Sequence, residues 1–359
     1  PGDDKKAASA LAKRNKKERE EGEVRQAIMD FGADWASATR PQVARGFSQI
    51  EAIGDDELAA AEEKRSRYES WRGSAEARGL HGLADIKTAQ YFLPILEGQA
   101  GSATTEGAFR AALKGEMQAE RLPGYGSAVG IARKRRFFHW FAEFPAALGM
   151  ADEGFDVIIG NPPFLGGQKL SGTFGEEYLS YLKAAFPPAG AMDLVGFFFR
   201  RNHELLRAGG RLALISTKTI AEGGTREGSL DVLTKGSTIY WAIKSMPWPG
   251  RAAVSVSLVA IRKARVAGPF VLNGKNVTTI SPYLDDAKIQ GNPHSLAENS
   301  GKSFQGSIVL GSGFVLTPEE AAALIEHDAR NRDVLFPYLN GEDLNSRPDG
   351  SPSRWVINF

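Results

Sequence analysis

The chain contains 359 residues, with 44 lysine and arginine residues against 43 aspartate and glutamate residues, and it has no cysteine. This length predicts two or three domains, and a hydrophobic content of 42% is ordinary for a soluble globular protein. The absence of cysteine excludes disulfides, thiolate metal sites and a cysteine nucleophile. No apolar run reaches the ~18 residues of a membrane span and no signal peptide is visible, so we expect a cytoplasmic protein with no membrane partner. A net charge of +1 means that any contact with nucleic acid must use local basic surfaces, or parts of the protein outside this sequence.

Residues 1–135 are expected to form an all-helical region of inserted character. Residues 1–30 are rich in Ala, Lys, Glu and Arg, and this composition favours a solvated helix or arm over a core element. Further helices are expected at residues 55–71, 84–96 and 105–119.

Three stretches lead up to the most informative part of the chain. Residues 124–130 have the composition of a glycine-rich cofactor loop, but no strand precedes them, so we interpret them as a plain loop. Residues 133–136, Arg-Lys-Arg-Arg, are the densest basic cluster, and both a phosphate contact and a solvated patch remain open. Residues 137–144 contain four Phe and one Trp, and we expect them to be a buried packing segment.

The next stretch predicts a strand followed by a stiff turn. Residues 155–159 are short, rich in β-branched residues and bounded by glycines, which indicates a buried strand. Asn161, Pro162, Pro163 and Phe164 follow it. Each proline fixes its own φ and forces the preceding residue into an extended shape. The turn therefore holds an amide and a ring at the carboxyl end of a strand, where open α/β sheets bind ligands.

The chemistry of this turn suits an amino group that must become nucleophilic. The side-chain carbonyl of Asn161 and the backbone carbonyl of Pro162 can both accept hydrogen bonds, and a rigid turn sets their positions in advance. Phe164 offers a flat face to a planar base. The alternative is a strand followed by a proline-rich loop, with Phe164 in the core.

The sequence Phe-Asp-Val-Ile-Ile-Gly-Asn-Pro-Pro-Phe at residues 155–164 resembles the catalytic motif of DNA N6-adenine methyltransferases. The chain is similar to type IIG/IIL restriction–modification enzymes and to the adenine methyltransferase of the DISARM phage-defence system. The likeness covers about residues 85–359 and includes residues 138–144, 193–195, 248–256 and 333–341.

This resemblance implies a fold, a reaction and its partners. The fold would be α/β: part of a Rossmann-like class I methyltransferase sheet, with a helical N-terminal region and a C-terminal α+β recognition region. The cofactor would be S-adenosyl-L-methionine and the substrate double-stranded DNA, with other defence-system subunits as further partners. The enzyme would flip adenine out of the duplex and methylate N6, marking host DNA in a restriction or phage-defence system.

The resemblance divides the chain at two points. Residues 1–135 would be the helical inserted region, residues 136–265 the catalytic half of the methyltransferase domain, and residues 266–359 the start of a target-recognition domain.

Two residues outside the turn are candidates for the base pocket. Lys169 lies in a polar stretch, residues 165–172, that we expect to be a mobile loop able to clamp the extruded nucleotide; a plain connecting loop is the alternative. Trp248 stands in the loop between two predicted strands, where family members line the base pocket; a core tryptophan is the alternative.

The remaining elements complete a sheet. A helix with Leu194, Phe198 and Leu205 on one face is expected to end at Gly209-Gly210, before a strand at residues 211–215, which predicts a right-handed parallel crossover. Asp193 would favour the dipole at the start of that helix. A helix is expected at residues 231–233, and strands at 239–243 and 253–261. A capping box at residues 317–320 predicts a helix to about His327, and residues 355–359 resemble an unfinished strand.

The chain lacks the usual cofactor motifs. No glycine-rich turn after a first strand and no acidic residue at the end of a second strand appears, so we expect these motifs upstream of Pro1. No metal-binding pattern is present. Two alternatives stay open: a methyltransferase acting on RNA or protein glutamine, and a non-catalytic DNA-binding subunit that kept the fold.

Overall fold

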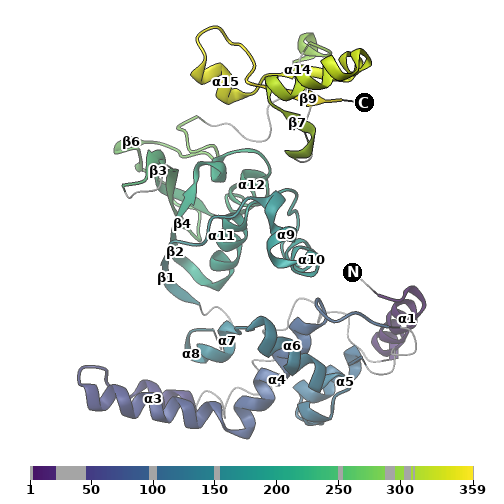
Figure 1. Cartoon of the computed structure of the whole chain (residues 1–359). Coiled ribbons are helices and arrows are strands. Elements are labelled where there is room, and N and C mark those ends of the chain that lie inside the picture. The colour runs from purple at the N-terminus through teal and green to yellow at the C-terminus, as the bar shows by residue number, and fades with distance from the viewer. Residues whose placement is uncertain are drawn as a thin grey trace. The chain divides into compact units, whose positions relative to one another are not determined.

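The computed structural model describes residues 3–21, 46–96, 103–148, 154–249, 254–287, 296–302, 309 and 312–358 (Figure 1). The chain separates into two compact units, residues 1–291 and 292–359. The first unit holds a group of helices followed by a six-stranded sheet, and the second holds a three-stranded sheet with helices. This mixed architecture confirms the predicted α/β class, whereas the boundaries at residues 135 and 265 remain predictions. None of the described helices combines the length and apolar content that a bilayer-spanning segment needs.

The helical region is organised around α4. Its helices are α1 (Lys5–Glu21), α3 (Leu58–Arg72), α4 (Ala75–Ala89), α5 (Glu106–Leu113), η1 (Ala119–Arg121), α6 (Tyr125–Arg135), α7 (Trp140–Glu143) and α8 (Pro145–Leu148). The Ser74 side chain caps α4 by accepting a hydrogen bond from the backbone N–H of Ala77. Leu80 and Leu83 project from one face of α4 into a core shared with α5, η1 and α7.

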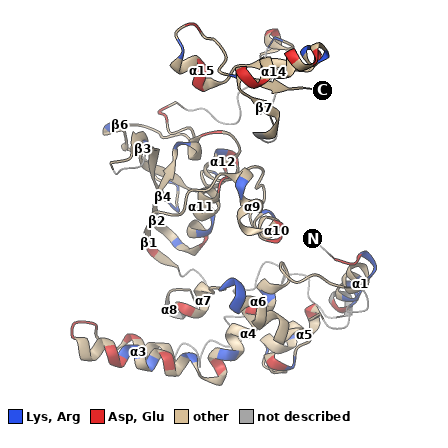
Figure 2. Ribbon diagram, viewed as in Figure 1, with Lys and Arg blue, Asp and Glu red and all other residues tan. Residues whose placement is uncertain are grey.

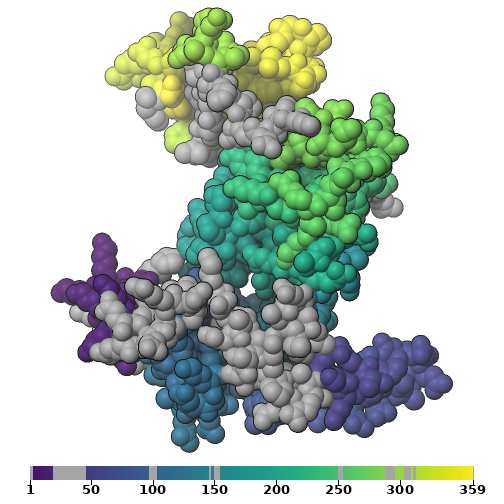
Figure 3. Space-filling view, turned by 180° about the vertical axis from the view of Figure 1, so that it is seen from behind, coloured from purple at the N-terminus to yellow at the C-terminus, as the bar shows by residue number. Residues whose placement is uncertain are grey.

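The first helix is tied to this region through backbone groups. The side chains of Asn15 and Glu18 on α1 accept hydrogen bonds from the N–H groups of Glu106 and Gly107 at the start of α5. The helical prediction for residues 1–30 is confirmed over α1, while residues 22–45 lie outside the described part of the chain. By contrast, α3 buries none of its residues and projects away from the other helices (Figures 1 and 3).

Three predictions for this region are wrong in whole or in part. Residues 124–130 are not a loop, because all but Gly124 form the first half of α6, which packs its small residues Ala128 and Ala132 inward against α4. The helix predicted at 84–96 ends at Ala89, before Pro94, which disfavours helix in the residue that precedes it. The helix predicted at 105–119 is interrupted after Leu113 and resumes only as the short η1.

The main sheet has the strand order β1-β2-β4-β3-β5-β6. Its strands are β1 (Phe155–Gly160), β2 (Leu206–Thr217), β3 (Thr238–Pro247), β4 (Ser255–Arg262), β5 (Phe270–Leu272) and β6 (Lys275–Val277). β1 pairs with β2 in parallel, and β4 runs antiparallel between β2 and β3. The strands predicted at 239–243 and 253–261 are thereby confirmed, except that residues 250–253 lie outside the described residues.

The parallel crossover from β1 to β2 is confirmed. It runs through η2 (Gly167–Lys169), α9 (Leu170–Phe174), α10 (Glu176–Ala185) and α11 (Leu194–Leu205). Val195 and Phe199 of α11 pack on Leu212 and Leu214 of β2 in the main core. The predicted stop at Gly209-Gly210 is wrong, because α11 ends earlier and both glycines lie within β2, at an irregularity in its pairing with β1. Gly209 has a φ of +74°, which suits glycine in a bulge better than at a helix end.

β1 is an edge strand in the described sheet, and this corrects the expectation that it is buried. Val157 is 51% exposed and Ile159 is 78% exposed, both on one face of the strand, and β1 pairs only with β2 among the described strands. Phe155, at its start, packs against the rings of Trp140 and Phe144 at centroid distances of 5.9 and 5.4 Å. The prediction that residues 137–144 are buried is therefore wrong for Phe138 and Phe144, which are 55% and 39% exposed, although the Trp140 and Phe144 rings do pack on Phe155.

The remaining elements follow the sheet. In the first unit they are η3 (Lys218–Ala221), α12 (Gly223–Gly228) and α13 (Leu230–Leu233), the last of which confirms the helix predicted at 231–233. The second unit has η4 (Ala297–Asn299), η5 (Ser312–Phe314), β7 (Val315–Leu316), α14 (Pro318–His327), η6 (Ala329–Asp333), β8 (Leu335–Tyr338), α15 (Gly341–Ser346) and β9 (Arg354–Ile357). The predicted capping box is confirmed: Thr317 and Glu320 exchange two hydrogen bonds, and α14 ends at His327. The strand expected near the last residues is β9.

Candidate active site

The Asn-Pro-Pro-Phe turn (residues 161–164) leaves β1 at its carboxyl end without regular secondary structure. Asn161 is exposed, and its side-chain amide forms no hydrogen bond with any described residue. Pro162 is buried and anchors the turn, whereas Phe164 is 37% exposed and has no ring contact with another described aromatic residue. The Asn161 amide is therefore unpaired among the described residues, and the Phe164 ring is only partly covered.

Asp193 holds the chain just beyond the turn. Its Oδ1 accepts a hydrogen bond from the backbone N–H of Gly167 at 2.8 Å, and its Oδ2 accepts one from the Thr219 hydroxyl at 2.7 Å. The backbone N–H of Asp193 in turn donates to the Thr225 hydroxyl at 3.0 Å. One carboxylate thus connects the loop after β1 to the segment after β2.

The role predicted for Asp193 is therefore incomplete. The residue stands at the N-cap of α11, but its side chain accepts no bond from that helix. The loop approaches it closely, because a Cβ at Gly167 would lie 2.7 Å from the Ala191 carbonyl oxygen. A glycine at this position lets the backbone come near enough to bond to the carboxylate.

Lys169 does not lie in a mobile loop, and the prediction of one at residues 165–172 is wrong. Residues 167–169 form η2 and α9 begins at Leu170, whose side chain is fully buried in a cluster with Leu182 and Phe197. That burial fixes the segment. Lys169 itself is exposed and has no ion pair with a described residue, so its ammonium group is free to meet a phosphate.

Trp248 lies at the same edge of the sheet as the Asn-Pro-Pro-Phe turn. β1, β2 and β3 run in one direction, so their carboxyl ends share an edge, and Trp248 follows β3. Its backbone N–H donates to the Val254 carbonyl at 2.9 Å, and its side chain is half-buried. β1 and β3 are three strand spacings, or about 14 Å, apart across the sheet, and Trp248 lies several residues further along the strand direction than Asn161, so the two side chains do not touch.

The end of β2 supplies residues that sequence reasoning missed. Thr217 and Thr219 hydrogen bond to each other through their hydroxyls at 2.7 Å, and Lys218 between them is exposed. β2 is the direct neighbour of β1, with Leu214 opposite Gly160. Ligands bind at the carboxyl ends of such strands. The residues directly after the strand predicted at 211–215 could therefore have been chosen as site candidates from the sequence.

The described residues include none of the motifs expected to hold a cofactor. No described strand precedes β1, so none of the described turns joins a first strand to a helix in the way that dinucleotide and related cofactors require. No group of three or more described His, Asp or Glu residues could hold a metal ion. The cofactor-binding residues therefore remain unassigned.

Residues 105–242 match the family described as Eco57I restriction-modification methylase. The matched segment contains the Asn-Pro-Pro-Phe turn, Asp193 and the parallel crossover to β2. It ends before Trp248.

Two solved structures resemble the chain weakly. One is the type IIL restriction-modification enzyme MmeI in complex with DNA, with a TM-score of 0.41 and 22% identity over 56% of this chain and 29% of that one. The other is assigned as a type I restriction enzyme modification subunit from Vibrio vulnificus YJ016, with a TM-score of 0.24 and 12% identity over 60% of this chain and 52% of that one. The likeness therefore spans about a third and about half of these proteins. No curated protein matches the chain.

Proposed function

We propose that this chain carries the substrate side of a DNA methyltransferase that uses S-adenosylmethionine to methylate adenine N6, within a restriction or phage-defence system. The observation that carries the proposal is the exposed, unbonded amide of Asn161, held by two prolines at the end of β1 within the segment that matches the methylase family. On this proposal the six-stranded sheet is the catalytic half of a class I methyltransferase sheet. Residues 266–359 would belong to a target-recognition domain.

The target adenine must first leave the duplex, because its amino group is not accessible while the base is stacked. The exposed ring of Phe164 provides a face on which the everted base can stack, worth ~1–3 kcal/mol per base at such sites. Lys169 and Lys218, both exposed beside the turn, would contact flanking phosphates. Trp248, at the same edge of the sheet, would border the bound DNA away from the target base.

The amino group is activated by acceptors rather than by a base. The Asn161 side-chain oxygen and the Pro162 carbonyl accept the two N6 hydrogens, which favours pyramidal nitrogen and stabilises the positive charge that develops on it. No described residue donates a hydrogen bond to either acceptor, so both lone-pair sets are available. When bound, the cofactor would supply the methyl group and leave as the neutral thioether, and one N6 proton would pass to solvent. Positioning accounts for much of the acceleration, and no covalent enzyme intermediate is required.

The test compares wild-type full-length protein with Asn161→Ala, using S-adenosylmethionine labelled in its methyl group and a panel of duplex DNAs. We expect label in adenine with wild type, and a loss in kcat of about 10²-fold or more with the variant. Its free energy of unfolding should change by less than about 0.5 kcal/mol, because the amide has no partner to lose. Asn276→Ala is the matched control, since Asn276 is another exposed, unbonded asparagine, on β6 at the far edge of the sheet.

The outcomes separate the alternatives. Label in RNA or in protein glutamine, lost with Asn161→Ala, would keep the chemistry and change the substrate. DNA binding without any transfer of label would identify a non-catalytic subunit. Equal activity in Asn161→Ala and wild type would remove the turn from the mechanism.

A further inference from the structure

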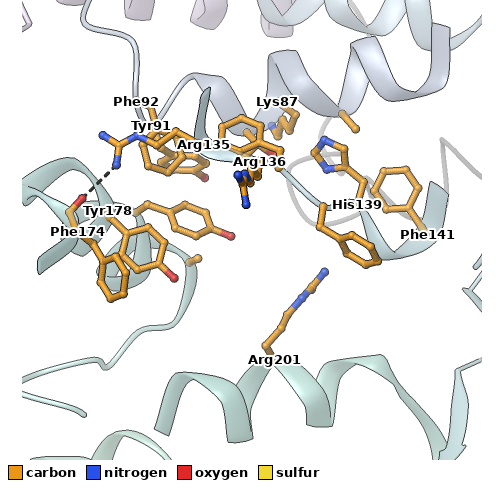
Figure 4. Close-up of a pocket in the computed structure, with 16 residues that line it drawn as sticks. Lys87, Tyr91, Phe92, Arg135, Arg136, His139, Phe141, Phe174, Tyr178 and Arg201 are labelled. Atoms are coloured by element: carbon orange, nitrogen blue, oxygen red, sulfur yellow. Dashed lines mark hydrogen bonds between the residues drawn. The ribbon is translucent and has the colours of Figure 1, made fainter. Parts of the chain in front are cut away.

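A cavity of about 660 Å³ lies outside the Asn-Pro-Pro-Phe turn, between α4, the end of α6 and the segment that follows it, and helices α9, α10 and α11 (Figure 4). Its volume falls within the ~300–1,000 Å³ of typical small-molecule sites. None of its lining residues belongs to residues 161–164, so it is separate from the candidate active site.

Aromatic rings form much of the cavity wall. Tyr91 and Phe92, which follow α4, pack against Tyr181 of α10 at centroid distances of 5.0 and 5.8 Å. Phe137 adds a ring 5.4 Å from Phe92, and Tyr178 lies 6.2 Å from Tyr181. These rings come from both sides of the cavity, and each is only partly buried, so their remaining faces are open to a planar ligand.

The charge of the lining is entirely positive. Lys87, Arg135, Arg136 and Arg201 line the cavity, and no carboxylate is among its described lining residues, although Glu177 lies 3.8 Å from Arg135 and Asp85 hydrogen bonds to His139 at 2.8 Å. The basic run at the end of α6 is visible as a blue segment in Figure 2. An aromatic wall with several cations and no acid is suited to an anion that also carries a flat ring.

The arginines have different roles. Arg135 is already engaged: its Nη1 donates to the Phe174 carbonyl at 3.1 Å, and its guanidinium lies over the Phe92 ring at 5.3 Å. This arginine joins the two sides of the cavity. Arg136 is exposed and forms no side-chain hydrogen bond or ion pair with any described residue.

Arg201 faces Arg136 from the opposite wall. It extends from α11 toward the side of the cavity that carries Arg136 and His139 (Figure 4). Its only side-chain partner in the described chain is Glu204, one turn away at 3.2 Å, with both side chains close to half exposed. Such surface pairs are weak, so a phosphate can displace the carboxylate.

We propose that this cavity binds a nucleotide, with the base against the aromatic wall and the phosphate between Arg136 and Arg201. Guanidinium groups bind phosphate through paired N–H donors, and aromatic faces stack bases whatever their sequence. The nucleotide can be a free nucleoside phosphate or part of a DNA strand, because the two share this chemistry. The proposal does not depend on methylation and concerns different residues.

The test measures binding to the full-length protein by calorimetry, with ATP, inorganic tripolyphosphate, a ten-nucleotide oligodeoxythymidine and a ten-residue polyglutamate as probes. We expect ATP or the oligonucleotide to bind about tenfold or more tightly than tripolyphosphate and polyglutamate, because only nucleotides use the rings. Arg136→Gly and Arg201→Gln should each weaken that binding by about tenfold. Glycine is chosen at position 136 because Arg136 has a φ of +54°, which glycine adopts without strain.

Arg133→Gln and Lys134→Gln are the matched controls. Both residues belong to the same basic run and are exposed, but neither lines the cavity, so binding should change less than about twofold. Binding of ATP identifies a free nucleotide, and binding of the oligonucleotide alone identifies a strand; either supports the proposal if the cavity variants weaken it. The proposal is overturned if neither nucleotide binds, if tripolyphosphate or polyglutamate binds equally well, or if the control variants lose as much affinity. Failure of the Asn161→Ala test leaves this result unaffected.

Discussion

Replacing Asp193 by alanine removes the carboxylate that joins the loop after β1 to the segment after β2. Two hydrogen bonds are lost, from the Gly167 N–H at 2.8 Å and from the Thr219 hydroxyl at 2.7 Å. A hydrogen bond to a charged group contributes about 1.5–3 kcal/mol. Asp193 is only half-buried, and water can reach the freed donors, so we take the low end for each bond and expect a loss of about 3 kcal/mol in the free energy of unfolding.

Two variants make this prediction specific. Asp193→Asn keeps an oxygen for Gly167 and should lose only about 1 kcal/mol. Asp156→Ala is the matched control: Asp156 pairs with Arg207 at 2.6 Å, but their side chains are 77% and 47% exposed. An exposed ion pair contributes at most about 1 kcal/mol, so Asp156→Ala should lower the free energy of unfolding by no more than about 1 kcal/mol despite the short distance.

Urea denaturation followed by circular dichroism measures all three variants. We expect the transition midpoint to fall most for Asp193→Ala while the slope against urea stays the same. If the proposed function holds, the same variant should also lower kcat, because the loop that follows the turn is no longer fixed. The reasoning fails if Asp193→Ala unfolds within about 0.5 kcal/mol of wild type, or if Asp156→Ala loses as much stability.

Three further predictions use other parts of the fold. In a urea titration, Gly154→Ala should lower the free energy of unfolding by about 2–3 kcal/mol, because its Cβ would lie 2.3 Å from the backbone nitrogen of Arg207. Gly130→Ala is the contrasting variant: it lies in the interior of α6, its Cβ would have open space around it, and it should raise the free energy of unfolding by about 0.5–1 kcal/mol. Burial lowers the pKa of His203 to about 4, so the unfolded state binds its proton first as the pH falls. The contribution of His203 to the free energy of unfolding is at its full value above about pH 6.5 and falls by up to about 3 kcal/mol as the pH drops towards 4. In His203→Gln the free energy of unfolding should therefore depend less steeply on pH over this range. Trp248→Ala should raise the KM for DNA more than it lowers kcat in the methylation assay. Equal effects on KM and kcat would contradict a role for Trp248 in binding DNA.

The parts of the fold that sequence reasoning predicted have local signals. β1 is a short β-branched run between glycines, β4 begins with alternating serine and apolar residues before a stretch buried on both faces, and α14 begins at a capping box. Each of these patterns concerns neighbours in the chain, which the sequence displays directly.

The elements that were missed depend on distant contacts. Residues 124–130 contain three glycines and resemble a loop, but α6 forms because its small residues allow close packing on α4; a Cβ at Gly82 would lie 2.5 Å from the Tyr125 ring. Gly209 has the sequence context of a helix end, yet it lies in a bulge of β2. This bulge accompanies the register shift in the pairing of β2 with β1. Neither the packing of α6 on α4 nor the pairing of β2 with β1 can be predicted from the local helix and strand propensities of these residues.

The candidate site shows the same division. The identity of the turn residues could be read from the sequence. The structure leaves the Asn161 amide without a hydrogen-bond partner among the described residues and Phe164 partly exposed, while their catalytic role stays a prediction. The tie between Asp193, Gly167 and Thr219 could not be predicted, because these residues meet only after the crossover forms.

The uncovered side of β1 also affects how the chain behaves at high concentration. Its backbone donors and acceptors on that side have no partner strand in the described sheet, and the adjoining Val157 and Ile159 side chains are exposed. A bare apolar strand edge is a template on which another polypeptide can add a strand, and natural proteins usually protect such edges with charge or proline. We therefore expect isolated preparations of these 359 residues to aggregate as their concentration rises, and a lysine in place of Ile159 to delay that association.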